Sequence, residues 1–181
     1  MTSIPGLWAF VVSAGLMISL WFFSLQYFKQ PTGKAFFLII TSALFWSLTY
    51  IGELVIADFS LKMVFVRLQF IGINTFPLSW LILAALHTKV HIKKSVWALI
   101  ASIWLILFVF IFFIPAPNLF WGLPTLVDLA PSSSMFVINY HYGPLFYFLL
   151  IPYVYVLLFF SFLFMVKGLS KGHVFYRKQL T

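Results

Sequence analysis

Five long apolar stretches divide the chain, and each approaches the ~20 residues that an α-helix needs to cross a hydrocarbon core ~30 Å thick. The pattern predicts helices over residues 7–28, 35–56, 66–87, 96–114 and 144–166. Short polar or basic links separate them, except for the long segment 115–143. Its prolines and serines predict a loop, and its aromatic residues favour a structured cap on the membrane surface. The predicted fold class is therefore all-α, with residues 1–181 forming one membrane-embedded helical bundle.

Composition supports this prediction and excludes most soluble classes of protein. Hydrophobic residues make up 64% of the sequence and charged residues only 8%, whereas soluble domains average about 25% charged residues. The chain contains no cysteine, which rules out disulfides and cysteine metal sites. We predict neither a cofactor nor a metal.

The basic residues predict the orientation of the bundle. Nine of the eleven lie in the links after the first, third and fifth predicted helices: Lys29, Lys34, Lys89, Lys93, Lys94, Lys167, Lys171, Arg177 and Lys178. Cytoplasmic loops of membrane proteins carry an excess of Lys and Arg. We therefore expect a multi-pass protein of the plasma membrane with its N-terminus outside and its C-terminus in the cytoplasm. Basic clusters between apolar runs report topology, so we do not expect nucleic acid as a partner.

Glu53, one of three acidic residues, is the most informative polar position. Trp46, Tyr50 and Glu53 follow i, i+4, i+7 spacing and share one helix face. Arg67 and Gln69 begin the third predicted helix at a similar depth, and a Glu53–Arg67 pair with Gln69 nearby would offset the cost of burying both charges. Two interpretations remain open and are compatible: a static clamp between the second and third helices, or the polar floor of an outward-facing ligand pocket.

The remaining polar residues favour packing over chemistry. Asn74 and Pro77 predict a kink in the third helix, which serves as a packing device or as a hinge. His87 and His91 share a helical face, but no acidic residue lies near them to complete a metal site. The chain carries no hydrolase, phosphate-loop or metalloprotease motif. We therefore do not predict an enzyme.

Several segments resemble one family. Residues 46–54 (WSLTYIGEL), 67–73 (RLQFIGI) and Pro77 are similar to the second- and third-helix signature of the N-terminal seven-helix sensor region of bacterial and archaeal histidine kinases. Residues 118–121 (NLFW), 140–144 (YHYGP) and 176–179 (YRKQ) resemble further parts of that region. Helices six and seven and the kinase motifs are absent from this sequence. A fragment of a longer sensor and a natural five-helix protein are both consistent with it.

The resemblance implies a sensor that detects an extracellular or membrane-borne stimulus. It would pass the signal to a cytoplasmic kinase or another output domain, in the same chain or in trans, and it leaves a homodimer and the identity of a small or hydrophobic ligand open. Our candidate site joins the polar residues above with three aromatic or histidine residues of the loop: Trp46, Tyr50, Glu53, Arg67, Gln69, Asn74, Trp121, Tyr140 and His141. The alternatives are a small transporter or channel subunit and a structural partner in a larger membrane complex.

Overall fold

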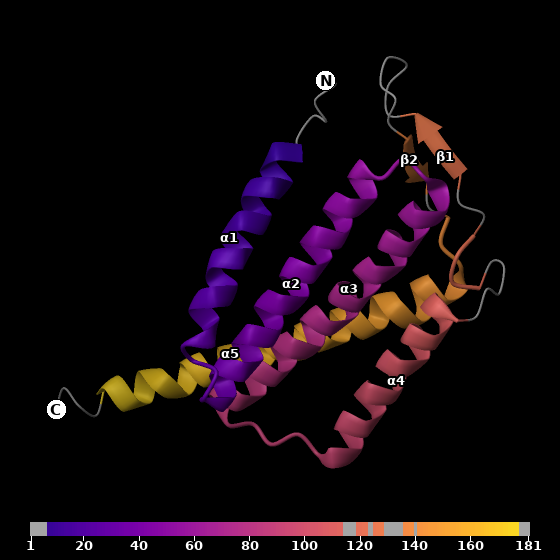
Figure 1. Ribbon diagram of the computed structural model, residues 1–181. Coiled ribbons are helices and arrows are strands. Elements are labelled where there is room, and N and C mark those ends of the chain that lie inside the picture. Colours follow the sequence, from indigo (N-terminus) through magenta and orange to yellow (C-terminus); the bar gives the residue numbers. More distant parts are fainter. Residues whose placement is uncertain (1–6, 114–118, 123–124, 129–135, 140, 178–181) are drawn as a thin grey trace.

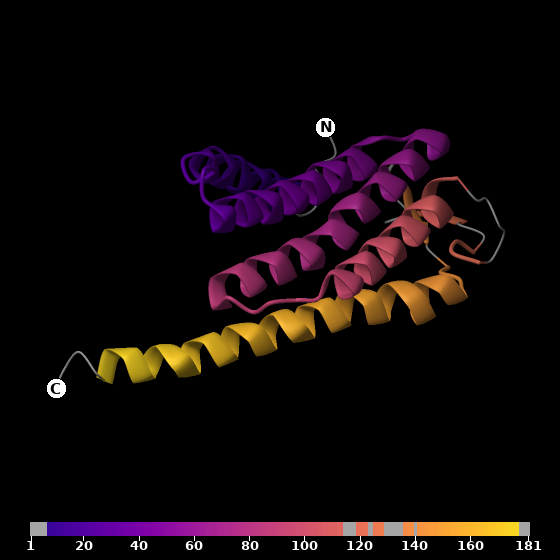
Figure 2. The same cartoon turned by 90° about the horizontal axis from the view of Figure 1, so that it is seen from below.

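The computed structural model describes residues 7–113, 119–122, 125–128, 136–139 and 141–177. Its helices are α1 (Leu7–Leu25), α2 (Pro31–Val55), α3 (Phe59–Thr88), α4 (Lys94–Phe112) and α5 (Ile151–Arg177), the last preceded by the π-helical turn η1 (Phe146–Leu150). All five are long and apolar enough to cross a membrane, which confirms the predicted helical membrane architecture. α3 lies at the centre, because it packs against both α2 and α5 (Figures 1 and 2).

The two ends of the bundle differ in character. The "loop end" carries the α2–α3 turn and the segment that joins α4 to η1 (Figure 1). The "basic end" carries the α1–α2 and α3–α4 links, with Lys29, Lys34, Lys89, Lys93 and Lys94 in or beside them.

α2 and α3 form a tight hairpin. Asp58 caps α3 at its N-terminus, where its side chain accepts a hydrogen bond from the Leu61 backbone N–H at 2.8 Å. The helix consequently begins at Phe59, well before the predicted start at residue 66. Further along, a side chain at Gly72 would lie within 2.8 Å of the Ser42 carbonyl and of Trp46. Glycine therefore allows the two backbones to approach closely.

The long connection contains a β-hairpin that the sequence analysis did not predict. Strands β1 (Thr125–Asp128) and β2 (Phe136–Asn139) pair antiparallel, and an antiparallel bridge between Trp121 and Tyr142 lies nearer the helices. The all-α fold class holds, and the two four-residue strands are a local addition within the connection. Between the strands and the helices, the Gly143 N–H donates to the Phe120 carbonyl at 2.9 Å, so the base of the loop is tied together by backbone hydrogen bonds.

The core joins α3, α4, α5 and the loop segment. Its buried members are Val66, Phe70, Leu81, Ile100, Leu107, Ile111, Phe120, Leu150, Tyr153 and Leu157. α1 contributes little to this core and packs on α2, where the Trp21 indole N–H donates to the Thr41 hydroxyl at 3.0 Å. Many large apolar side chains are exposed on the outside of the helices, as expected for surfaces that face lipid.

Candidate functional site

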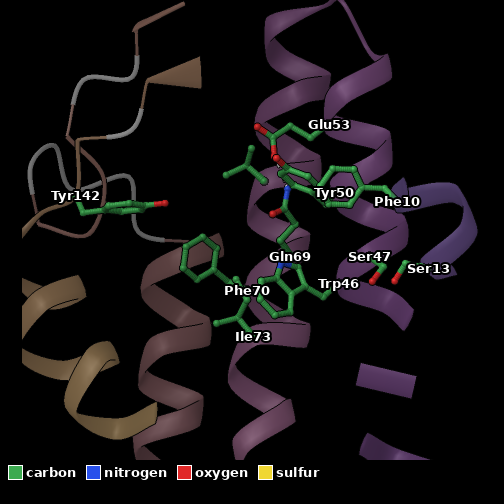
Figure 3. A pocket seen from close by; sticks show the side chains of 11 residues that line it. Phe10, Ser13, Trp46, Ser47, Tyr50, Glu53, Gln69, Phe70, Ile73 and Tyr142 are labelled. Carbon is green, nitrogen blue, oxygen red and sulfur yellow. Dashed lines mark hydrogen bonds between the residues drawn. The ribbon is translucent and has the colours of Figure 1, made fainter. Parts of the chain in front are cut away.

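A cavity of about 530 Å³ lies at the loop end, between α1, α2 and α3. Five aromatic side chains line it, and four polar side chains besides the tyrosines face it. Its lining consists of Phe10, Ser13, Trp46, Ser47, Tyr50, Glu53, Val66, Gln69, Phe70, Ile73 and Tyr142 (Figure 3). The size falls within the ~300–1,000 Å³ of sites that hold small molecules.

The polar floor of the cavity is built around Glu53. This side chain is only 4% exposed, and its carboxylate accepts a hydrogen bond from the Gln69 amide at 2.5 Å (Figure 3). Hydrogen bonds to a charged group are stronger than neutral ones. The bond therefore holds α2 and α3 together while it orients the carboxylate beside the cavity.

Lys62 lies beneath this floor and does not line the cavity itself. It is 2% exposed, and its ammonium donates to the Glu53 backbone carbonyl at 2.5 Å. That carbonyl belongs to the last turn of α2, where carbonyls lack partners within the helix and the helix dipole favours a cation. The buried charges of Lys62 and Glu53 thus offset one another.

Arg67 does not take the place that the sequence analysis gave it. The structure pairs Glu53 with Gln69 and Lys62 instead, while the buried Nε of Arg67 has no hydrogen-bond partner within the described part of the chain. The reason is geometric, because residues two apart on a helix point in different directions. Arg67 and Gln69 could not both face Glu53, whereas Lys62 lies seven residues before Gln69 and shares its face.

The aromatic wall follows the spacing of α2. Trp46, Tyr50 and Glu53 all line the cavity, as their shared helix face predicts. Phe10 of α1 closes the wall with an edge-to-face contact to Tyr50, at 5.0 Å between ring centroids. α1 is thus a wall of the cavity.

Tyr142 covers the cavity from the loop, and Figure 3 shows its hydroxyl pointing inward. Burial raises the pKa of this phenol to about 12, with smaller contributions from the charge of Glu53 and from Tyr147. Its ring stacks on Phe146, the first residue of η1, at 3.7 Å between centroids and an interplanar angle of 9°. One residue therefore touches both the cavity and the helix that leads to the C-terminal residues.

The other predicted site residues lie outside the cavity. Trp121 packs behind it against Phe70, at 5.2 Å between ring centroids. His141 is exposed. Asn74 is buried in α3 without lining the cavity, and Tyr140 lies outside the described residues.

Sequence reasoning missed Lys62, Phe10, Ser13, Ser47, Phe70 and Tyr142 as parts of this site. Helical spacing from Gln69 could have identified Lys62. No sequence signal places α1 against this part of α2.

Five apolar helices and an aromatic cavity with a buried acid at one end define a multi-pass membrane protein with a ligand-sized site. The comparison with family models gives its family: the N-terminal 7TM region of histidine kinase matches residues 7–181. The chain belongs to this family and is a membrane sensor module. No curated protein and no solved structure matches it.

The described residues contain no group of three or more His, Cys, Asp or Glu side chains that could hold a metal ion. The cavity presents aromatic surfaces, hydroxyls, an amide and an acid that accepts a hydrogen bond from that amide.

Proposed function

We propose that this cavity binds an amphiphilic ligand and that its occupancy is passed through α5 to a cytoplasmic output domain of the kinase type. The observation that carries the proposal is the position of Tyr142, which covers the cavity and stacks on Phe146 at the start of η1 and α5. A ligand that displaces Tyr142 must alter this stack, because the two rings are in direct contact.

The lining supports a ligand with an apolar body and one polar group. Phe10, Trp46 and Phe70 offer aromatic surfaces to the body, and the Glu53–Gln69 pair offers hydrogen-bonding groups to the polar part. Burial of apolar surface supplies most of the affinity in such sites, and a few fixed polar groups supply the specificity.

The direction of signalling rests on the orientation of the bundle. Lys and Arg gather at the basic end, which supports a cytoplasmic basic end and an outward-facing cavity. η1 also suits a switching role, because π-helical turns interrupt the regular hydrogen bonding of a helix and occur frequently at functional sites. A movement of Phe146 would change how α5 is positioned against the core.

The experiment replaces the unknown ligand with a side chain. Ser47→Trp fills the cavity from α2, while Leu48→Trp adds the same group on an exposed, lipid-facing position of the same helix. The chain has no cysteine, so Lys34→Cys and Val166→Cys give two unique sites for nitroxide labels on α2 and α5. Pulsed electron resonance then measures the distance between the labels in vesicles.

We expect Ser47→Trp to shift this distance distribution and Leu48→Trp to leave it unchanged. Equal distributions in both variants and the parent would show that cavity occupancy does not reach α5, and the sensing proposal would fail. Circular dichroism of all three proteins shows whether each variant keeps the helical content of the parent.

A further inference from the structure

A second cavity, of about 580 Å³, lies between α4 and α5, which meet near the loop end and diverge below it in the view of Figure 1. It shares no lining residue with the first cavity. Leu81, Ile100 and Leu157 form a buried floor. Leu99 and Val156 form an exposed rim, which leaves the cavity open to the surrounding lipid.

One buried hydroxyl interrupts this apolar lining. Tyr153 of α5 faces the cavity and is 6% exposed, and its hydroxyl has no hydrogen-bond partner among the described residues. The other polar side chains of the lining, His91 and Lys93, are exposed at the basic end. His91 and Lys93 lie in the link between α3 and α4. Tyr153 lies near the start of α5, at the loop end.

An unpartnered hydroxyl inside a membrane-spanning bundle is costly. Transferring a hydroxyl into apolar surroundings without a hydrogen bond is unfavourable, and the bilayer core offers no bulk water in compensation. An ordered water is a poor substitute, because buried waters need two to four polar partners and the neighbours of Tyr153 in the lining, such as Leu149 and Pro152, are apolar. A ligand atom that accepts a hydrogen bond would remove this cost.

We infer that this cavity binds a neutral, membrane-soluble molecule that presents a carbonyl oxygen to the Tyr153 hydroxyl. The apolar floor and rim suit a flat or elongated hydrocarbon body, and the volume suits a small molecule. The single buried donor selects for an acceptor, because a site that is built to hydrogen-bond one group discriminates against analogues that lack it. The molecule is neutral because the described lining places no charged group beside Tyr153.

Two matched probes test the inference. Fluorenone and fluorene share one ring skeleton and differ in that fluorenone carries a carbonyl where fluorene carries a methylene. Equilibrium dialysis against protein-containing and protein-free liposomes gives the dissociation constant of each probe. We expect fluorenone to bind the parent protein about three- to tenfold more tightly than it binds Tyr153→Phe, as one hydrogen bond implies. Fluorene should bind both proteins equally.

The infrared spectrum supplies a second readout. Hydrogen bonding lowers the carbonyl stretching frequency, so bound fluorenone should show a lowered frequency with the parent and the free value with Tyr153→Phe. This variant removes only an unpaired hydroxyl, and we expect it to fold at least as stably as the parent.

Three control variants separate this site from other effects. Val156→Trp fills the cavity from its rim and should weaken both probes. Leu48→Trp adds a ring at an exposed position of α2 that lines neither cavity, and Tyr147→Phe removes an exposed tyrosine hydroxyl of η1. Both should leave binding unchanged. If Tyr153→Phe leaves the affinity for fluorenone unaltered, the inference is wrong. The second cavity would then bind lipid chains or another apolar helix through burial of apolar surface alone.

Discussion

Lys62 shows how a charge is accommodated at the end of a membrane helix. Its ammonium satisfies a carbonyl of the last turn of α2, and the charge of Glu53 stabilises it further. A buried cation with one fixed acceptor is a structural element, because a substitution leaves that acceptor without a partner. The pair therefore links the folding of the α2–α3 hairpin to the geometry of the cavity floor.

We predict that Lys62→Met lowers the free energy of unfolding by about 2 kcal/mol, the range for hydrogen bonds that involve charged groups. Reversible unfolding in mixed micelles measures the change, and Lys34→Met, at an exposed position of α2, should alter it by less than about 0.5 kcal/mol. In the double variant with Glu53→Gln, the loss should be smaller than the sum of the single losses, because each single variant leaves one charge uncompensated. Strict additivity would contradict the charge compensation.

Tyr142 provides a titratable probe of the cavity cover. Its folded pKa is raised from the ordinary 10.0 to about 12, so the folded state holds the phenol proton more tightly than the unfolded state does. The stability contributed by the neutral phenol is present below pH 10 and is lost as the pH rises from 10 towards 12. The phenolate absorbance of the parent minus that of Tyr142→Phe should titrate near pH 12.

The same titration tests the electrostatic contact with Glu53. Glu53→Gln removes a negative charge that disfavours the phenolate, so the pKa of Tyr142 should fall while remaining above 10, since burial is the larger cause. Tyr147 also raises this pKa; Tyr147→Phe should produce a smaller decrease. A Tyr142 pKa near 10 in the parent would mean that the phenol is exposed to water and does not cover the cavity.

Helical spacing set the limit of what could be predicted about the site from sequence. Trp46, Tyr50 and Glu53 could be grouped because a single helix fixes their relative directions. Arg67 was chosen for its charge against the same geometric rule, and the structure places Gln69 and Lys62 beside Glu53 instead. Tyr142 could not be placed, because its position depends on contacts between a loop and a distant helix.

At the scale of elements, hydropathy located five helices but not all of their ends. α3 begins at Phe59 because Asp58 caps it; the polar residues Ser60 and Lys62 made this turn look like a link. The β-hairpin was missed because its two four-residue strands are too short to give a periodic signal. Helices that bury an apolar surface can be recognised from sequence, whereas a short strand is defined mainly by the strand with which it pairs.

The η1 turn yields a prediction about coupling between elements. Phe146→Leu keeps an apolar side chain but removes the stack on Tyr142, which we expect to cost about 1 kcal/mol of stability. It should also abolish the change in label distance that Ser47→Trp produces between α2 and α5. Phe148→Leu is the matched control, since Phe148 lies in the same turn and is 81% exposed. A distance change that persists in Phe146→Leu would place the coupling in the direct packing of α3 against α5.

At the scale of the whole molecule, both cavities border the α3–α5 core but lie at different places in it. The first is roofed by the residue that stacks on η1, and the second exposes a hydroxyl from α5 itself. Buried hydroxyls elsewhere in the bundle, such as those of Ser42, Ser79 and Ser161, donate to carbonyls of their own helices. They therefore serve helix packing, and it is the match to the sensor region of histidine kinases that supports a sensor module over a transporter or channel subunit.

The orientation of the bundle decides which compartment the first cavity samples. The chain lacks cysteine, so single cysteines can report sidedness without background. We predict that a membrane-impermeant maleimide added to intact cells labels His141→Cys, at an exposed position of the loop end, and labels Lys93→Cys, exposed at the basic end, only after the cells are opened. The physical reason is the retention of lysine-rich links on the cytoplasmic side during insertion.

Labelling of Lys93→Cys in intact cells would place the basic end outside and turn the aromatic cavity toward the cytoplasm. The ligand would then be an intracellular or lipid-borne compound, and the proposed direction of signalling through α5 would be reversed.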